Sequence, residues 1–507
     1  MRPLQRPDAA GVVLLLVLAG LAAVVAAGFP GYSYDDAFIT YRCAKNWAEG
    51  AGLLFNPGER VLGTTAPGYG LLLGVLSALT GLSVPVWGTL LAVTSLAAVA
   101  LVLRSALTEA PPAVRAGAPL LFALAAFPLQ WNVELLGAET FPILALGAAA
   151  AHLALDRNRP AVAGLLISVA MACRLDAGLL AALLGLALWW QRRRFPWAFA
   201  LTGLLPLALF LVWLQTETGA IVPHTMVVKQ SELKLVEAGY SYTMREWRWL
   251  RRGVSWAGCL ALFGLALWAL AEGGRAVLRR RTIPGAWPAA VLGLWLLVHE
   301  AAYRLLGVPF APWYHVYLMN GLLAAAALGA ALAASRLLGG RVVLSTVAAA
   351  VLLLPLLIPS AAWMARQYGR PPDPRWPGYV EAARIIRQGG GSVAAVEIGF
   401  LGYFSEAPVL DLMGLVSPEA LAARQQGDLG SLVARERPEW LLDVTLFRAQ
   451  VLDQVMTDPR VASAYRQVAD LPDGRHPGIR IRILRRVTPA RTAASPNPPP
   501  ARAGRGS

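Results

Sequence analysis

Eleven runs of apolar residues with few charges follow one another through the first 362 residues of this chain. A helix that spans a bilayer needs about 20 mostly apolar residues, with roughly 17 as the lower limit. Charged residues make up only 15% of the chain, whereas an average soluble domain has about 25%. The sequence therefore predicts an all-α polytopic membrane domain of about eleven transmembrane helices and excludes an ordinary soluble protein. The runs lie at about 11–29, 86–103, 118–133, 140–155, 160–175, 178–191, 196–214, 253–271, 286–306, 316–335 and 342–362.

Arginine clusters mark every second connection between these runs. Basic residues concentrate in the cytoplasmic loops of membrane proteins, so the clusters predict a cytoplasmic N-terminus and a C-terminal region on the outer side. This orientation leaves no crossing for the apolar stretch Tyr69–Leu82, which lies in the first outer loop, residues 30–85. We therefore expect the stretch to form a re-entrant or interfacial helix on the outer side. The clusters are Arg2/Arg6, Arg104/Arg115, Arg157/Arg159, Arg192–Arg194, Arg275/Arg279–Arg281 and Arg336/Arg341.

The character of the sequence changes after the membrane domain, which we expect to cover residues 1–362. Strand-like and helical segments alternate in residues 363–486, and this predicts a small extracytoplasmic α/β domain. The last segment, 487–507, is rich in Pro, Ala, Arg and Ser and is expected to be disordered. The three cysteines are scattered and form no metal-binding pattern. The predicted strands are Ser392–Ile398, Val409–Leu412, Trp440–Val444 and Ile479–Leu484, and the predicted helices are Tyr379–Gln388, Pro418–Gln426 and Ala449–Met456.

Two adjacent carboxylates, Asp35 and Asp36, lie at the start of a predicted surface helix in the first outer loop. The simple interpretation is structural: Asp36 caps this helix and both acids complement its dipole. One acid is enough for a cap, however, and charge at a membrane boundary is costly unless it has a use. The alternative is that one of the two acts as general base toward an acceptor hydroxyl. The pair could also hold a divalent cation, but the sequence requires none.

Further ionisable residues interrupt the apolar runs at the outer level, namely Glu139, Arg174 and Asp176. A structural explanation is an intramembrane ion pair that fixes a helix turn. Ionisable residues in such surroundings also mark polar cavities, and the predicted orientation brings them to the same side as Asp36. They therefore favour a single polar cavity that opens outward.

Two more outer segments carry candidate binding residues. His224 and Lys229 could hold a phosphate, with Lys229 as a mobile point charge, or they could belong to a solvated loop. Tyr314 and His315 lie in an aromatic cluster. Such a cluster is typical of a membrane interface belt and could also serve as a sugar-binding platform.

Taken together, these motifs resemble those of the GT-C superfamily of membrane glycosyltransferases. The most specific match is Asp35-Asp36-Ala-Phe-Ile-Thr-Tyr-Arg42, followed by Gly52-Leu-Leu-Phe-Asn56-Pro-Gly-Glu-Arg60. It is similar to the first loop of bacterial polyprenyl-phosphate-sugar transferases, above all that of the mycobacterial terminal β-arabinofuranosyltransferase group. The chain also resembles the related protein mannosyltransferases. Four further segments resemble that group, although Leu175 and His224 depart from its pattern. They are Gly137–Thr140, Cys173–Gly178, Pro223–Lys229 and Asp411–Pro418.

The resemblance implies an inverting enzyme in the bacterial inner membrane. It would move a sugar, with arabinofuranose or another pentose favoured, from a polyprenyl-phosphate donor to a glycan, lipid or protein acceptor at the outer face of the bilayer. No cofactor is required, and no nucleic acid is expected as a partner. The alternatives are a transporter or flippase for lipid-linked sugar and a non-catalytic, glycan-binding membrane scaffold. The implied roles are Asp36 or Asp35 as the base, Lys229, Arg174, Arg42 and His224 at the donor phosphate, and Glu139, Asp176, Tyr314 and His315 at the substrate.

Overall fold

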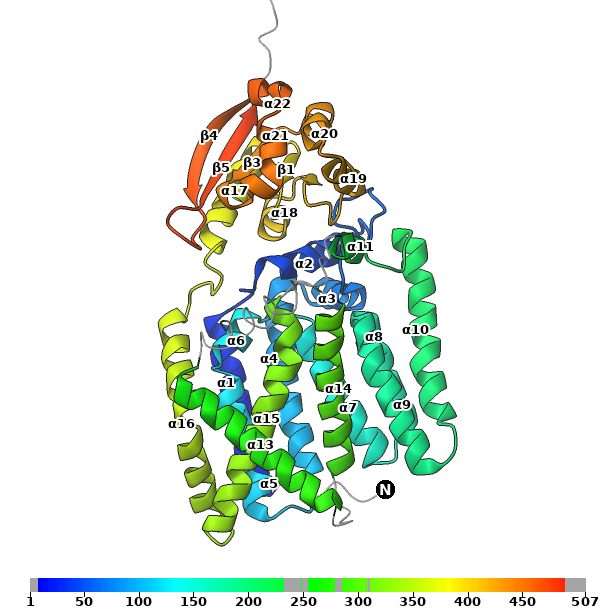
Figure 1. Cartoon of the computed structure of the whole chain (residues 1–507), viewed down its shortest axis with the longest axis vertical. Helices are drawn as coiled ribbons and strands as arrows, with labels where there is room; N and C mark the ends of the chain where they lie inside the picture. Colours follow the sequence, from blue (N-terminus) through cyan, green and yellow to red (C-terminus); the bar gives the residue numbers. More distant parts are fainter. Residues whose placement is uncertain are drawn as a thin grey trace, which may run out of the picture.

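The computed structural model describes residues 8–231, 248, 254–278, 285–306, 308 and 311–487. Long helices stand side by side in a bundle, and a smaller module that contains a sheet sits on one end of it (Figure 1). Each of the eleven apolar runs of the sequence forms a helix of this bundle. These helices are α1 (Ala9–Gly28), α4 (Val84–Ala106), α5 (Pro112–Ala126), α7 (Thr140–Leu155), α8 (Pro160–Cys173), α9 (Gly178–Arg192), α10 (Trp197–Thr218), α13 (Trp256–Leu278), α14 (Ala286–Leu305), α15 (Val316–Leu337) and α16 (Val342–Gln367).

Five of the described helices are long and apolar enough to cross a membrane: α1, α4, α10, α16 and α15 with the turn before it. Large apolar side chains point away from the bundle on these helices, such as Leu16, Leu209 and Val343, which are 68%, 65% and 77% exposed. So many exposed apolar side chains are expected of a protein that faces lipid. The chain is therefore a multi-pass membrane protein, and the number of eleven crossings stays a prediction.

Two short helices, α2 (Asp35–Ala48) and α3 (Pro67–Thr80), lie at the end of the bundle that carries the module (Figure 1). Helix α3 corresponds to the stretch Tyr69–Leu82, and it packs against α2 across this end, as a juxtamembrane helix does. One expectation for α2 is wrong. The helix begins at Asp35, its N-cap is Tyr34, and no side chain caps it, so Asp36 is not the helix cap.

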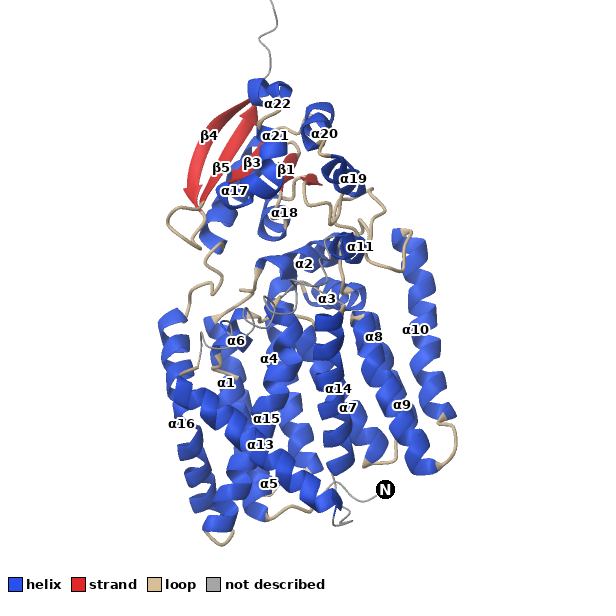
Figure 2. Ribbon diagram, viewed as in Figure 1, coloured by secondary structure: helices blue, strands red, loops and turns tan. Residues whose placement is uncertain are grey.

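The smaller module contains a five-stranded sheet with helices packed around it (Figure 2). The strand order is β2-β1-β3-β5-β4; β1 pairs in parallel with β2 and β3, and β5 pairs antiparallel with β3 and β4. The four expected strands are present, and the sequence prediction missed the edge strand β4 and the helices α18, α20 and α22. The strands are β1 (Val393–Ala395), β2 (Val409–Asp411), β3 (Trp440–Val444), β4 (Tyr465–Pro472) and β5 (Arg480–Arg486). The helices are α17 (Trp376–Gly389), α18 (Gly399–Ser405), α19 (Pro418–Gln426), α20 (Leu429–Glu436), α21 (Asp453–Met456) and α22 (Pro459–Ala464).

Helix α18 joins the module to the membrane domain by packing directly on α2. Two glycines allow this close approach. A Cβ atom on Gly399 would lie 1.9 Å from the backbone oxygen of Asp35, and one on Gly402 would lie 2.6 Å from the Phe55 ring. The Phe38 ring also packs against Phe400 and Phe404 of α18, with centroids 5.0 and 5.4 Å apart. The helix that carries the two adjacent aspartates is therefore held between the bundle and the module.

Candidate functional site

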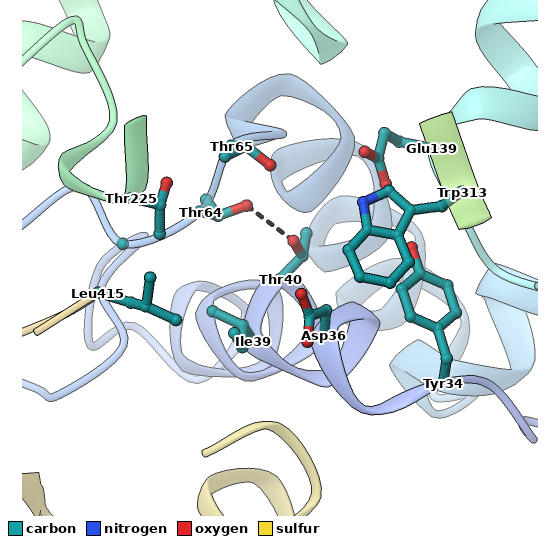
Figure 3. Close-up of a pocket in the computed structure, with 11 residues that line it drawn as sticks. Tyr34, Asp36, Ile39, Thr40, Thr64, Thr65, Glu139, Thr225, Trp313 and Leu415 are labelled. Atoms are coloured by element: carbon teal, nitrogen blue, oxygen red, sulfur yellow. Dashed lines mark hydrogen bonds between the residues drawn. The ribbon is translucent and has the colours of Figure 1, made fainter. Parts of the chain in front are cut away.

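A pocket of about 440 Å³, including space open to solvent, lies where α2, the loop before α3, α11 (His224–Ser231) and the module meet. Figure 3 shows Asp36 at its floor, Glu139, Tyr34 and Trp313 on one side, and Thr225 and Leu415 on the other. The hydroxyl oxygens of Thr40 and Thr64 are 2.7 Å apart between these two sides. Carboxylates, hydroxyls and an aromatic ring are the groups that recognise a polar ligand with an apolar face. The pocket is lined by Tyr34, Asp36, Ile39, Thr40, Gly63, Thr64, Thr65, Glu139, Thr225, Trp313 and Leu415.

The two adjacent aspartates have different surroundings. Asp36 lines the pocket, whereas the Asp35 side chain is buried and its Oδ1 accepts a hydrogen bond of 2.8 Å from the backbone N–H of Phe400, at the start of α18. Asp35 therefore supplies a cap for a helix of the module, a role for which the sequence around it gives no signal. Burial raises the pKa of Asp35 to about 7, against the opposing effect of the Arg375 charge, while Glu397 and Asp36 raise it further.

This raised pKa predicts that Asp35 makes folding pH-dependent. The folded state keeps a proton on Asp35 that the unfolded chain releases near pH 4, so stability falls as the pH rises from about 4 to about 7 and then levels off. Asp35→Asn keeps the oxygen that accepts from Phe400 but cannot ionise. Between pH 5 and pH 8 we expect the wild type to lose on the order of 2–4 kcal/mol more of its free energy of unfolding than Asp35→Asn. The thermal midpoint of the wild type in detergent should therefore fall further over this range than that of the variant. Asp453→Asn, at an exposed position, controls for charge removal; equal pH profiles for wild type and Asp35→Asn would contradict the prediction.

Glu139 reaches the pocket from the start of α7 and is held there by Arg174. The Arg174 guanidinium contacts Glu139 at 2.7 Å and Asp176 at 2.9 Å, and it also donates to the Tyr303 hydroxyl at 2.8 Å. The donors of Arg174 are thus engaged by two carboxylates and a hydroxyl, and neither Arg174 nor Asp176 lines the pocket. The charge of Arg174 is thus balanced by carboxylates, and its expected phosphate contact stays a prediction. The three residues come together as expected, with Arg174 orienting Glu139.

The aromatic cluster after α14, expected to be an interface belt or a sugar-binding platform, reaches the pocket through Trp313. Trp313, in the turn η2 (Pro312–His315), lines the pocket and stacks on Tyr34 with ring centroids 4.7 Å apart. Tyr314 instead packs over Arg174, 5.2 Å from its guanidinium carbon. His315 is fully buried, and its Nδ1 lies 3.0 Å from a Glu300 carboxylate oxygen. Of this cluster only Trp313 lines the pocket, and the substrate contacts expected of Tyr314 and His315 stay predictions.

Helix α11 borders the opposite side of the pocket, and two of its polar atoms have no hydrogen-bond partner among the described residues. They are Nε2 of His224 and Oγ1 of Thr225, and both are buried. Burial lowers the pKa of His224, so the ring is a neutral hydrogen-bonding group. The Lys229 backbone belongs to α11, but its side chain lies outside the described part of the chain. Unpaired buried polar groups are costly, so these two atoms indicate a ligand-binding edge.

Arg42 lies at the junction between the domains and does not line the pocket, so its expected phosphate contact stays a prediction. Its side chain donates to the backbone oxygens of Phe55, Gly402 and Ala407 at 2.6, 2.6 and 2.7 Å. The guanidinium carbon also lies 4.4 Å from the centre of the Phe55 ring. Burial lowers the pKa of Arg42 to about 10. Arg42 therefore ties α2 to the module through backbone oxygens that no sequence motif reveals.

A divalent cation held jointly by Asp35 and Asp36 does not fit this geometry. The Asp35 carboxylate is engaged by the N–H of Phe400, and only Asp36 of the two lines the pocket. Among the described residues no group of three or more His, Cys, Asp or Glu side chains is placed to hold a metal ion.

A known sequence family matches only the C-terminal part of the chain, whereas solved structures resemble nearly the whole chain. Residues 365–491 match a family described as a domain of unknown function, DUF8728. No curated protein matches the sequence. The solved structures that resemble the whole chain include ArnT from Cupriavidus metallidurans bound to undecaprenyl phosphate, with 12% identity and a TM-score of 0.57 over 94% of this chain and 98% of that one.

The apo structure of the same ArnT has 14% identity and a TM-score of 0.53, with the same shares covered. A variant of the arabinofuranosyltransferase AftD from mycobacteria has 17% identity and a TM-score of 0.47, over 94% of this chain and 41% of that one. The likeness to ArnT shows that this chain has a GT-C membrane fold, which confirms the fold class expected from the sequence.

Proposed function

We propose that this protein is a glycosyltransferase that moves a sugar from a polyprenyl-phosphate donor to an acceptor hydroxyl. The observation that carries the proposal is the position of Asp36. Its carboxylate lines a pocket of hydroxyls and an aromatic ring at the end of an apolar helical bundle, where a lipid tail and a polar head group meet. ArnT, which shares the fold, has been seen with undecaprenyl phosphate bound, and we infer a carrier of the same class here.

In this proposal Asp36 removes the proton from the acceptor hydroxyl, whose oxygen then attacks the anomeric carbon of the donor. The new carbon–oxygen bond forms as the bond from that carbon to the phosphate oxygen breaks, and the electron pair leaves with the polyprenyl phosphate. Attack opposite the leaving group inverts the anomeric centre. Glu139, held by Arg174 at 2.7 Å, binds hydroxyls of the sugar or the acceptor, and Trp313 offers an apolar face to the ring.

The departing phosphate is assigned to the α11 side of the pocket. The unpartnered atoms of His224 and Thr225 can donate hydrogen bonds to phosphate oxygens, and Lys229 on the same helix can add a positive charge, as the sequence predicts. Donors placed where negative charge develops lower the barrier of the reaction. The arginine distribution predicts that this end of the bundle faces the outside of the inner membrane, where donors must be lipid-linked.

The test is transfer by purified protein in nanodiscs from synthetic polyprenyl-phosphate arabinofuranose, mannose and glucose to a membrane-extract acceptor. Product with an inverted anomeric centre is expected from at least one donor, and a pentose donor is favoured. Movement of intact donor across a vesicle membrane without product would instead support a transporter. Tight donor binding with neither transfer nor movement would support the scaffold alternative.

A further inference from the structure

The loop at residues 412–417, between β2 and α19, belongs to the module but reaches the pocket of the membrane domain. Asp411, which is fully buried, holds the loop in shape. Its carboxylate accepts hydrogen bonds of 2.9 and 3.0 Å from the backbone N–H groups of Met413 and Val416. Its own N–H donates to the Ser417 hydroxyl at 3.0 Å. A loop closed on itself in this way is preformed and needs no ligand to order it.

Three contacts seat this loop on the membrane domain. Leu415 lines the pocket beside Thr225 (Figure 3). Val416 packs against Gly63 so closely that a Cβ atom on Gly63 would lie 2.6 Å from Cγ1 of Val416. The backbone of Gly414 lies beside the His224 ring of α11. The loop therefore contacts both the segment before α3 and the helix to which we assign the donor phosphate.

We propose that this loop is a fixed wall of the pocket and that Leu415 determines which sugars fit. The inference rests on the proposed function and adds a specificity-determining residue from the module. Leu415 and Ile39 are the aliphatic side chains of a lining that otherwise offers mostly polar or aromatic groups. An aliphatic side chain gives a sugar hydroxyl no hydrogen-bond partner, so a hydroxyl or hydroxymethyl group placed against Leu415 loses its hydration without compensation. A hexose has one more hydroxylated carbon than a pentose and so has more polar surface to place against this wall, which therefore favours pentoses over hexoses.

Leu415→Ala tests the role in selectivity, with Met413→Ala as the matched control. Met413 lies in the same loop but contacts Arg424 of the module, with 3.5 Å between sulfur and nitrogen. The measured quantity is kcat/KM for hexose relative to pentose donors. Leu415→Ala is expected to raise this ratio at least about tenfold, the lower end of the effect of one methylene group in a binding pocket, and Met413→Ala to leave it unchanged. An unchanged ratio in Leu415→Ala would overturn the role of Leu415.

A disulfide tests the fixed position of the wall without relying on transfer. A Cβ atom on Gly63 would lie 3.5 Å from Cβ of Val416, within the range of about 3.5–4.5 Å that a disulfide requires. The double variant Gly63→Cys/Val416→Cys should therefore crosslink under mild oxidation in membranes, and each single variant should not. The native Cys43, Cys173 and Cys259 are all buried, so they are poor competitors.

A comparison of the oxidised and reduced forms of the double variant distinguishes a fixed wall from a lid that moves during turnover. Oxidised and reduced forms are expected to turn over at similar rates when the wall does not move. Loss of turnover on oxidation, restored by reductant, would show a moving lid and overturn the fixed wall. Absence of the crosslink would overturn the placement of the loop, whatever the transfer assay gives. A crosslink in a protein that transfers no sugar would reject the proposed function and keep the wall.

Discussion

Asp36→Asn is expected to lower the rate of sugar transfer by about 10²–10⁴-fold, the range that a positioned general base contributes. The amide keeps the size of the carboxylate, so the pocket should keep its shape and the variant should still bind the lipid-linked donor. The loss is therefore expected in kcat and not in KM. The measurement is product formation under saturating donor, together with the affinity for undecaprenyl phosphate.

Asp35→Asn is the matched control, because it makes the same chemical change one residue away. The Asp35 carboxylate faces the N–H of Phe400 and not the pocket, so this variant should keep most of its turnover. The opposite ranking, with Asp35→Asn inactive and Asp36→Asn active, would assign the role of general base to the buried Asp35. Full activity in both variants would show that neither Asp35 nor Asp36 acts as the general base.

The fold could be predicted from the sequence to a large extent, because membrane helices leave long apolar runs and arginines mark one side. Even the position of α3 followed, since a crossing by Tyr69–Leu82 would have turned every later arginine cluster to the wrong side. Edge strand β4 was missed because most of its residues are exposed and its apolar residues do not alternate regularly with polar ones. Helix α18 was missed because a short stretch that starts with glycine and is rich in aromatic residues has no helical pattern of its own. It is stabilised by α2.

The site could be predicted only in part, because residue type does not reveal partners. Asp35 and Asp36 are adjacent in the sequence, and what separates their environments is a helix from more than 360 residues later in the chain. Arg42 was expected at the donor phosphate because arginine is over-represented at phosphate sites, yet its partners are backbone oxygens of residues 402 and 407. The pocket hydroxyls of Thr64 and Thr225 carry no signal in the sequence, since threonine is common in loops and at the starts of helices.

Gly399→Ala is expected to loosen the contact between the module and the membrane domain. The added methyl group would lie 1.9 Å from the backbone oxygen of Asp35, and neither backbone can move aside without shifting a whole helix. Overpacking of this kind typically costs about 1–3 kcal/mol and occasionally more. Because α18 supports the helix that carries Asp36, transfer should fall along with the thermal midpoint.

Two other glycines make this prediction specific. Gly402→Ala would meet the tip of the Phe55 ring and the end of the Arg42 side chain at 2.6 and 2.9 Å, and these ends can shift, so a smaller loss is expected. Gly20→Ala, inside α1 with nothing within 4 Å of the new methyl group, should be neutral or slightly stabilising, as alanine usually is in a helix. The expected order of thermal midpoints is therefore Gly20→Ala highest, Gly402→Ala intermediate and Gly399→Ala lowest. If Gly399→Ala matched the wild type in both stability and transfer, α18 could not be seated on Asp35, and the module would have no part in holding Asp36 at the pocket.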